Sequence, residues 1–156
     1  MSQTAGSVLL MVAAVAIVIR LRSDESACLK ALRCALSIVY HAERKIMLYD
    51  SPIEEILIDF DNSSVPKPLS VNRNEGFTEA VQPVLKALRG HEQTVFGQFV
   101  EKLGQGYKED ALKLCEFTRK SLEEISLRAE AEHPSRVKLY TALPILCAVS
   151  LLVLIL

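Results

Sequence analysis

The side chains best suited to metal ligation or nucleophilic attack are four cysteines and three histidines: Cys28, Cys34, Cys115, Cys147, His41, His91 and His133. Zinc sites usually take ligands from close pairs such as Cys-x-x-Cys, and the sequence contains no such pair. Cys28 and Cys34 are six residues apart and would face different sides of a helix. The pattern therefore predicts no metal site, and we expect Cys28, Cys34 and Cys115 to be small core residues.

Carboxylates can act as general acids or bases, and they form two groups, one at Glu54, Glu55, Asp59 and Asp61 and one at Glu123, Glu124, Glu130 and Glu132. Acid–base catalysis needs neighbours that shift a pKa, whereas acids on amphipathic helices are usually exposed. The segment Gly104-Gln105-Gly106 lacks the Lys-Ser ending of a phosphate-binding loop and predicts the end of a helix instead. We expect no catalytic residue, no cofactor and no enzymatic activity, with a small membrane enzyme as a further alternative.

An apolar run near the amino terminus has the length of a membrane-spanning helix. From Ala5 to Ile19 the one polar side chain is Ser7, and Arg20 follows. A bilayer core needs about 20 helical residues, with about 17 as the short limit, so residues 4–21 are expected to span a membrane if Arg20 reaches the headgroups. A signal peptide and a buried core helix are the alternatives, although the basic region that precedes a signal peptide is absent.

The carboxyl end carries a second apolar run, because residues 139–156 contain no charged side chain. Basic residues lie just inside both runs: Arg20, Arg22, Lys30 and Arg33 after the first, and Arg128, Arg136 and Lys138 before the second. The positive-inside rule then puts residues 23–138 in the cytoplasm. A formal net charge of -1 gives no reason to expect nucleic acid as a partner.

Between the two runs, apolar residues recur at helical spacing, and no segment alternates with the period of a strand. Helices are predicted from a cap at Ser23 to near Asp50, from Ser51-Pro52 through Phe60, from Phe77 to Arg89, from Glu92 to Leu103, and from near Lys108 to a kink or break at Pro134. Residues 61–68 are expected to form a loop. The predicted fold is all-α, a cytoplasmic helical bundle over 23–138 flanked by transmembrane helices at 4–21 and 139–156.

The last of these helices carries an apolar seam whose spacings alternate between four and three residues: Ala111, Cys115, Thr118, Leu122, Ile125 and Ala129. We expect this seam to face the core. Glu123 and Glu124 lie off the seam, where exchange for Lys is expected to leave stability unchanged within about 0.5 kcal/mol. These two acids are candidates for docking a partner, with plain solvated acids as the alternative.

Several short motifs follow one another in order: Ile46-Met47, Ser51-Pro52-Ile53-Glu54-Glu55, Pro66-Lys67-Pro68-Leu69, Phe96-Gly97-Gln98-Phe99, Leu103-Gly104-Gln105, and Leu139-Tyr140 leading into the apolar end. In this order they resemble the stage III sporulation protein AB family. The chain departs from the family in the short stretch from Val71 to Gly76, where a fuller helix is usual, and at Tyr107, where an Asp is usual.

The resemblance implies a component of the transport channel between mother cell and forespore, in the mother-cell membrane. It also implies a bundle similar to the F-type platform domains of type II secretion systems. The expected partners are a cytoplasmic secretion-type ATPase similar to stage III sporulation protein AA, other membrane proteins of the channel, and the lipid bilayer. The alternative function, from the seam residues, is a self-associating helical membrane scaffold without a motor partner.

Overall fold

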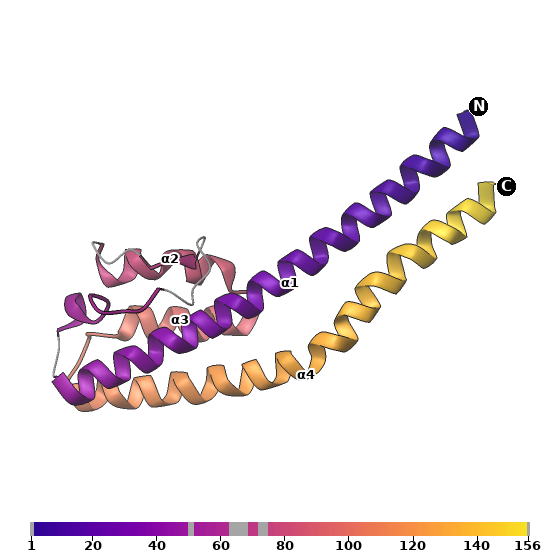
Figure 1. Cartoon of the computed structure of the whole chain (residues 1–156). Coiled ribbons are helices and arrows are strands. Elements are labelled where there is room, and N and C mark those ends of the chain that lie inside the picture. The colour runs from indigo at the N-terminus through magenta and orange to yellow at the C-terminus, as the bar shows by residue number, and fades with distance from the viewer. Residues whose placement is uncertain (1, 50–51, 63–68, 72–74, 156) are drawn as a thin grey trace. The chain divides into compact units, whose positions relative to one another are not determined.

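The computed structural model describes residues 2–49, 52–62, 69–71 and 75–155; the side chains of 2–11, 54, 136–137, 140–141, 143–144, 148, 151–152 and 154–155 lie outside the description. Over the described residues the chain is all-helical, without a strand, as predicted. Its elements in order are α1 (Ser2–Tyr49), the 3-10 helix η1 (Ile53–Glu55), α2 (Phe77–Ala87), α3 (Gly90–Lys102) and α4 (Lys108–Ile155) (Figure 1).

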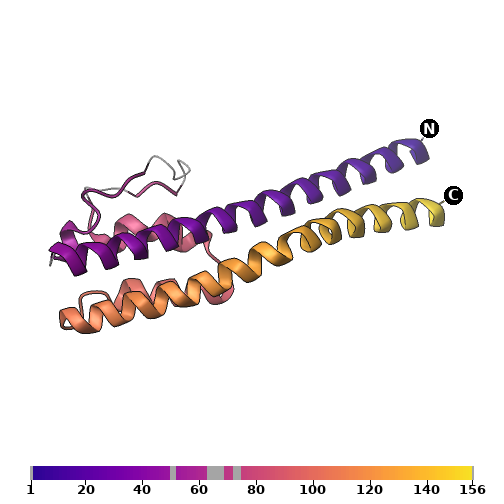
Figure 2. The same cartoon turned by 60° about the horizontal axis from the view of Figure 1, so that its bottom comes forward.

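The chain divides into two compact units. The bundle unit is Ala27–Arg128, and the terminal unit combines Met1–Ser26 with Ala129–Leu156. Within the bundle unit, α1 and α4 lie side by side in two views (Figure 1 and Figure 2), and α2 contacts α3. The boundaries predicted at 4–21, 23–138 and 139–156 stay predictions, because compact units report packing and not the position of a bilayer.

One hydrophobic core fills the bundle unit. Its largest fully buried side chains come from α1, the segment after η1, α2, α3 and α4, and include Leu32, Ile38, Ile56, Phe60, Val81, Val84, Phe96, Phe99 and Leu122. Burying one such side chain contributes roughly 1.5–3 kcal/mol. Phe99 stacks on Phe96 at 5.9 Å between ring centroids and meets Phe77 edge-on at 6.3 Å. The helical spacing of apolar residues after residue 23 corresponds to the inner face of α1, where Ala31, Ala35, Ala42 and Ile46 are also buried.

The turn between α3 and α4 depends on glycine. Gly104 follows the end of α3 with φ +101, a conformation that side-chain-bearing residues rarely adopt. A Cβ at this position would lie 1.9 Å from Cδ1 of Ile53, so η1 packs directly against the turn. The prediction that this segment ends a helix is confirmed.

Three predicted helix boundaries were wrong. A new helix does not start at Ser23, because no Gly or Pro interrupts residues 7–49 and Ser26 Oγ donates back to the Ser23 carbonyl at 3.3 Å within α1. At Pro134 a kink or a break was predicted, and the break is absent because α4 continues through this residue, where the hydrogen bonds of the adjoining turns can outweigh the one that proline removes. The kink stays a prediction.

The third error concerns residues 52–60, which form η1 and successive turns instead of an α-helix. Pro52 is extended, and the backbone bonds here span three residues, as from Ile56 N–H to the Ile53 carbonyl at 3.2 Å. The tighter turns still bury Leu57 and Phe60. The cap predicted at Ser51 and the loop residues 63–68 lie outside the described residues.

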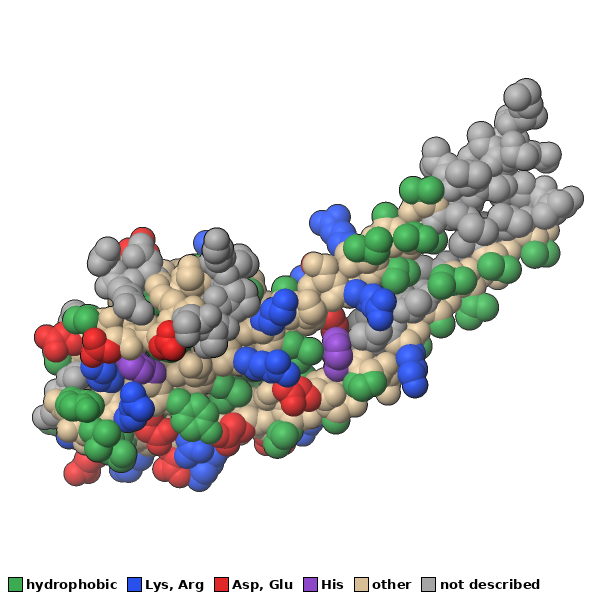
Figure 3. All heavy atoms as spheres, in the orientation of Figure 1, with side chains coloured by type: hydrophobic (Ala, Val, Ile, Leu, Met, Phe, Trp, Pro, Cys, Tyr) green, Lys and Arg blue, Asp and Glu red, His purple; other side chains and the backbone are tan. Residues whose placement is uncertain are grey.

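The terminal unit exposes large apolar side chains on both of its segments, among them Val12, Val15, Ile17, Ile19, Leu139, Leu146 and Val153. Figure 3 shows hydrophobic side chains along the described parts of these segments. Among the residues that the structure describes, no helix has both the length and the hydropathy needed to cross a bilayer.

Candidate docking surface on the bundle

The residues of the predicted seam lie at different depths. Cys115, Thr118 and Leu122 are buried, and Ala111 and Ile125 are partly buried against the core. Ala129, also partly buried, is the first α4 residue of the terminal unit. The inner face of α4 within the bundle unit therefore includes the first five seam positions.

The two predicted docking acids have different surroundings. The Glu123 carboxylate accepts hydrogen bonds from the Tyr40 hydroxyl of α1 and from Arg119 Nη1, the latter at 3.3 Å. Glu124 is exposed and pairs with Arg128 at 2.8 Å on its own helix. Glu123 therefore joins two helices, whereas Glu124 points to solvent.

Glu123 belongs to a cluster of four residues where α1 meets α4, together with Tyr40, Glu43 and Arg119. Arg119 donates from Nε to Glu43 at 3.1 Å and lies 5.5 Å from the centroid of the Tyr40 ring. The hydrogen bond between Tyr40 and Glu123 raises the pKa of the Tyr40 hydroxyl and lowers the pKa of the Glu123 carboxyl. Sequence reasoning missed Tyr40, Glu43 and Arg119, although the four-residue spacing of Arg119 and Glu123 was an available signal.

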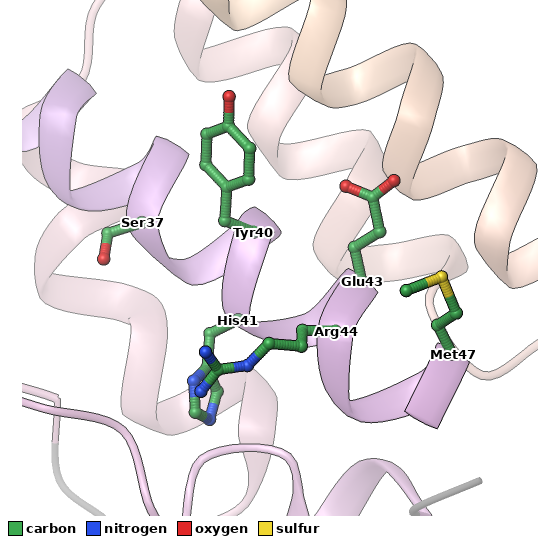
Figure 4. Close-up of a pocket in the computed structure, with 6 residues that line it drawn as sticks. All are labelled: Ser37, Tyr40, His41, Glu43, Arg44 and Met47. Atoms are coloured by element: carbon green, nitrogen blue, oxygen red, sulfur yellow. The ribbon is translucent and has the colours of Figure 1, made fainter. Parts of the chain in front are cut away.

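A pocket of about 400 Å³ opens beside this cluster and is lined by Ser37, Tyr40, His41, Glu43, Arg44 and Met47 (Figure 4). All six residues belong to α1, so the pocket follows the surface of that helix. In Figure 4, Tyr40 and Glu43 point to one side of α1, and His41 and Arg44 point to the other. The pocket thus combines an aromatic ring, a thioether and a guanidinium.

His41 forms the inner part of this pocket. Its ring meets the Phe60 ring edge-on at 5.5 Å between centroids, and its Nε2 is buried without a hydrogen-bond partner among the described residues. Burial lowers the pKa of His41, and the charges of Lys45 and Arg44 act in the same direction. A backbone hydrogen bond with Ile56 and the charge of Asp59 oppose them. Burial against the segment after η1 therefore disfavours the protonated form of His41.

Burial disfavours the thiolate form of the three cysteines in the bundle unit. Burial raises the pKa of Cys34 to about 11, and burial together with the charge of Glu43 raises the pKa of Cys115 to about 12. Cys28 Sγ donates to Glu92 at 3.5 Å, and burial and Glu92 raise its pKa as well. Cys34 and Cys115 are core residues as predicted, whereas Cys28 is half-buried. No cluster of His, Cys, Asp or Glu within the described part of the chain could hold a metal ion.

The chain matches a family of known proteins over almost its whole length. The sequence profile of the stage III sporulation protein AB family matches residues 3–156. No curated protein and no solved structure matched the chain.

Proposed function

We propose a function from one premise: this chain belongs to the stage III sporulation protein AB family. It is a stage III sporulation protein built around a helical bundle. We infer that it is a membrane platform of the transport channel between mother cell and forespore, and that it couples a cytoplasmic ATPase to the membrane assembly. The observation that carries this proposal is the extent of the match, which includes both apolar ends and the bundle.

The platform role requires that the ends enter a membrane, which we propose for residues 4–21 and 139–156 in the mother-cell membrane, with 23–138 cytoplasmic. The amino-acid sequence supports this, since residues 139–156 lack charge and Arg20, Arg22 and Lys138 flank the two runs. The compact packing of both ends in one terminal unit is compatible with two neighbouring helices in one bilayer.

Cysteine labelling tests this topology. We expect a membrane-impermeant maleimide to label Ser2→Cys in intact protoplasts, because both termini would lie outside the cytoplasm. Ser37→Cys, an exposed position of the bundle unit, is the control and should be labelled after permeabilisation only. The reverse pattern would overturn the proposed topology.

The partner in this proposal is a secretion-type ATPase similar to stage III sporulation protein AA, with other membrane proteins of the channel as neighbours. Glu123 and Glu124 are retained as proposed contacts. Glu124 is available to a partner without breaking an interhelical contact, because its one ion pair is exposed and lies within α4. Glu123 would contact a partner at the edge of the cluster with Tyr40 and Arg119.

The proposal is tested by co-purifying the ATPase with the full chain in detergent. Recovery of the hexameric ATPase is expected. Recovery of self-associated chain alone would contradict ATPase coupling and favour a self-associating scaffold. If Glu124 contacts the ATPase, Glu124→Lys should weaken the complex several-fold, as loss of a rim charge does by slowing association, while Glu79→Lys, an exposed acid on α2, serves as the control.

A further inference from the structure

The exposed side of α1 within the bundle unit has an unusual composition. Its exposed residues are Ala27, Lys30, Arg33, Ser37, Tyr40, Arg44, Met47, Leu48 and Tyr49, and from Lys30 onward we call them the α1 face. From Lys30 to Leu48 their backbone positions share one side of the helix through spacings of three, four and seven residues, although the Arg44 side chain turns away from Tyr40 (Figure 4). Tyr49 follows at the end of α1, on the side of Lys45. The face consists of cations and large apolar or aromatic side chains, with one serine.

The charge on the α1 face has a single sign. Lys30, Arg33 and Arg44 are exposed, and none of the exposed residues from 27 to 49 is an acid. The acid Glu43 is half-buried and engaged by Arg119, and the cation Lys45 is half-buried and paired with Asp59 at 2.5 Å. Among the residues that the structure describes, Lys30 and Arg44 form no ion pair. The two cations are separated by about 21 Å along the helix, at 1.5 Å per residue.

The apolar part of the face lies at the carboxyl end of α1. Met47, Leu48 and Tyr49 are 57%, 59% and 69% exposed, although each is a side chain that folding would normally bury. Tyr40 and Met47 also line the pocket of about 400 Å³ beside Arg44. Tyr, Met and Arg are enriched in the centres of protein interfaces, where aromatic anchors and desolvated guanidinium groups supply most of the binding energy.

We propose that the α1 face docks an acidic, partly apolar surface of the ATPase; this inference rests on the proposed function. Charge complementarity selects the occupant, because unpaired cations favour a negatively charged partner. The apolar end and the pocket beside Arg44 favour a protein surface over the phosphate backbone of a nucleic acid, which needs a larger basic excess than this chain has. Glu123 borders the face through Tyr40, so the α1 face would form the centre of the contact with the acidic surface, and the α4 acids at its rim would meet cations of the ATPase that lie outside that surface.

The two parts of the face would act at different stages of binding. Lys30 and Arg44 are exposed and would mainly accelerate the encounter, an effect that salt screens over roughly 10 Å at 0.1 M ionic strength. Met47 and Leu48 would be desolvated in the complex and would mainly slow its dissociation. The proposal therefore predicts separable effects on the association and dissociation rates.

The test measures binding of the purified ATPase to the full chain in liposomes of neutral lipid, at 50 and 300 mM salt. The test variant is Lys30→Glu/Arg44→Glu. The matched control is Lys113→Glu/Lys120→Glu, which makes the same charge change at exposed positions of α4. Circular dichroism confirms that each variant keeps the parent's helix content.

We expect the α1 double reversal to lower affinity at least tenfold at low salt and to remove most of the salt dependence, while the α4 control stays within twofold. Met47→Ala/Leu48→Ala should raise the dissociation rate at least fivefold with little change in association. Equal effects of the α1 and α4 reversals would overturn the docking surface but leave the platform role intact. An ATPase that does not bind the parent chain would overturn the platform role and this surface together. Self-association of the chain that depends on Lys30 and Arg44 would make a second copy of the chain the occupant in place of the ATPase.

Discussion

The outer faces of α1 and α4 carry charge in opposite ways. On α4 two exposed cations pair with acids four residues earlier, Glu116 with Lys120 at 2.7 Å and Glu124 with Arg128 at 2.8 Å. Figure 3 shows blue and red side chains interspersed along this helix. On α1 the exposed residues from 27 to 49 include cations and no acid. Two helices of one bundle therefore present a nearly neutral surface and a basic one.

The difference separates what stabilises the bundle from what is available to a partner. An exposed pair at this spacing contributes about 0.3–0.5 kcal/mol, and it also satisfies its charges locally. Within the described part of the chain, Lys30 and Arg44 on the α1 face form no such ion pair, so the bundle lacks this stabilisation there and the two charges are not compensated. An acidic partner, as proposed above, would compensate that charge. The sequence pattern alone favoured the α4 acids for docking, whereas the proposed interface has its centre on α1.

The largest expected effect tests whether the outer face of α4 is free of packing. Leu122 is fully buried, and Leu127 on the same helix is 71% exposed. Leu122→Ala should lower the free energy of unfolding by about 2–5 kcal/mol, because it leaves a cavity, whereas Leu127→Ala should stay within about 0.5 kcal/mol. Thermal unfolding of the full chain in detergent, followed by circular dichroism, measures both. Equal losses would mean that the outer face of α4 is packed and not available to a partner.

The next effect separates the two neighbouring acids. Glu123→Lys should destabilise the bundle by about 1 kcal/mol, because it removes the acceptor of Tyr40 and Arg119 and brings a cation beside Arg119. Glu124→Lys should change stability by no more than about 0.5 kcal/mol, since it loses one exposed pair. The position of both acids off the seam predicted two neutral exchanges, and the contacts of Glu123 revise that prediction for the first of them. Thermal unfolding of the full chain measures both variants. Equal losses of stability in Glu123→Lys and Glu124→Lys would show that the cluster around Glu123 does not hold α1 to α4.

Most of the fold was predictable because it follows from local periodicity. The inner face of α1, the α2 and α3 helices and the turn at Gly104 were all marked by apolar spacing or by glycine. The boundaries at Ser23 and Pro134 were wrong because a cap residue or a proline favours a boundary without requiring one. At both positions the helix continues before and after the residue, and cooperative helix formation outweighs the local preference for a boundary.

The docking surface was less predictable, because its key contacts join distant parts of the chain. Glu123 meets Tyr40 from 83 residues away, and Arg119 meets Glu43 from 76 residues away. No local spacing contains such a pair. The basic character of α1 is visible in the sequence, but its meaning depends on knowing that Glu43 and Lys45 are half-buried and already paired.

A pH effect of intermediate size tests the pocket side of α1. Burial first, and then the charges of Lys45 and Arg44, lower the pKa of His41 below its ordinary 6.5. The unfolded chain then binds the proton more readily, so the contribution of His41 to stability is complete above about pH 6.5 and is lost as the pH falls through the lower folded pKa. Melting temperatures of the full chain should therefore decline between pH 7 and 5.

The matched variants for this effect are His41→Gln, which should flatten the decline, and His91→Gln at the exposed start of α3, which should not. A decline that is unchanged in His41→Gln would place the responsible group elsewhere in the chain.

The smallest effect examines the charges themselves. Lys30→Gln/Arg44→Gln should leave the melting temperature of the full chain unchanged or slightly higher, because no ion pair is lost and like charges are removed from one face. Arg128→Gln should lower stability by up to about 0.5 kcal/mol, since it breaks the pair with Glu124.

When the ATPase is added, the order of stability of the two variants should reverse. A ligand that binds the folded chain stabilises it in proportion to the logarithm of the ligand concentration over Kd. The α1 variant would lose most of that added stabilisation and Arg128→Gln would keep it. A loss of intrinsic stability in the α1 variant would show instead that Lys30 and Arg44 serve the bundle, and that the two helices differ in charge for a structural reason.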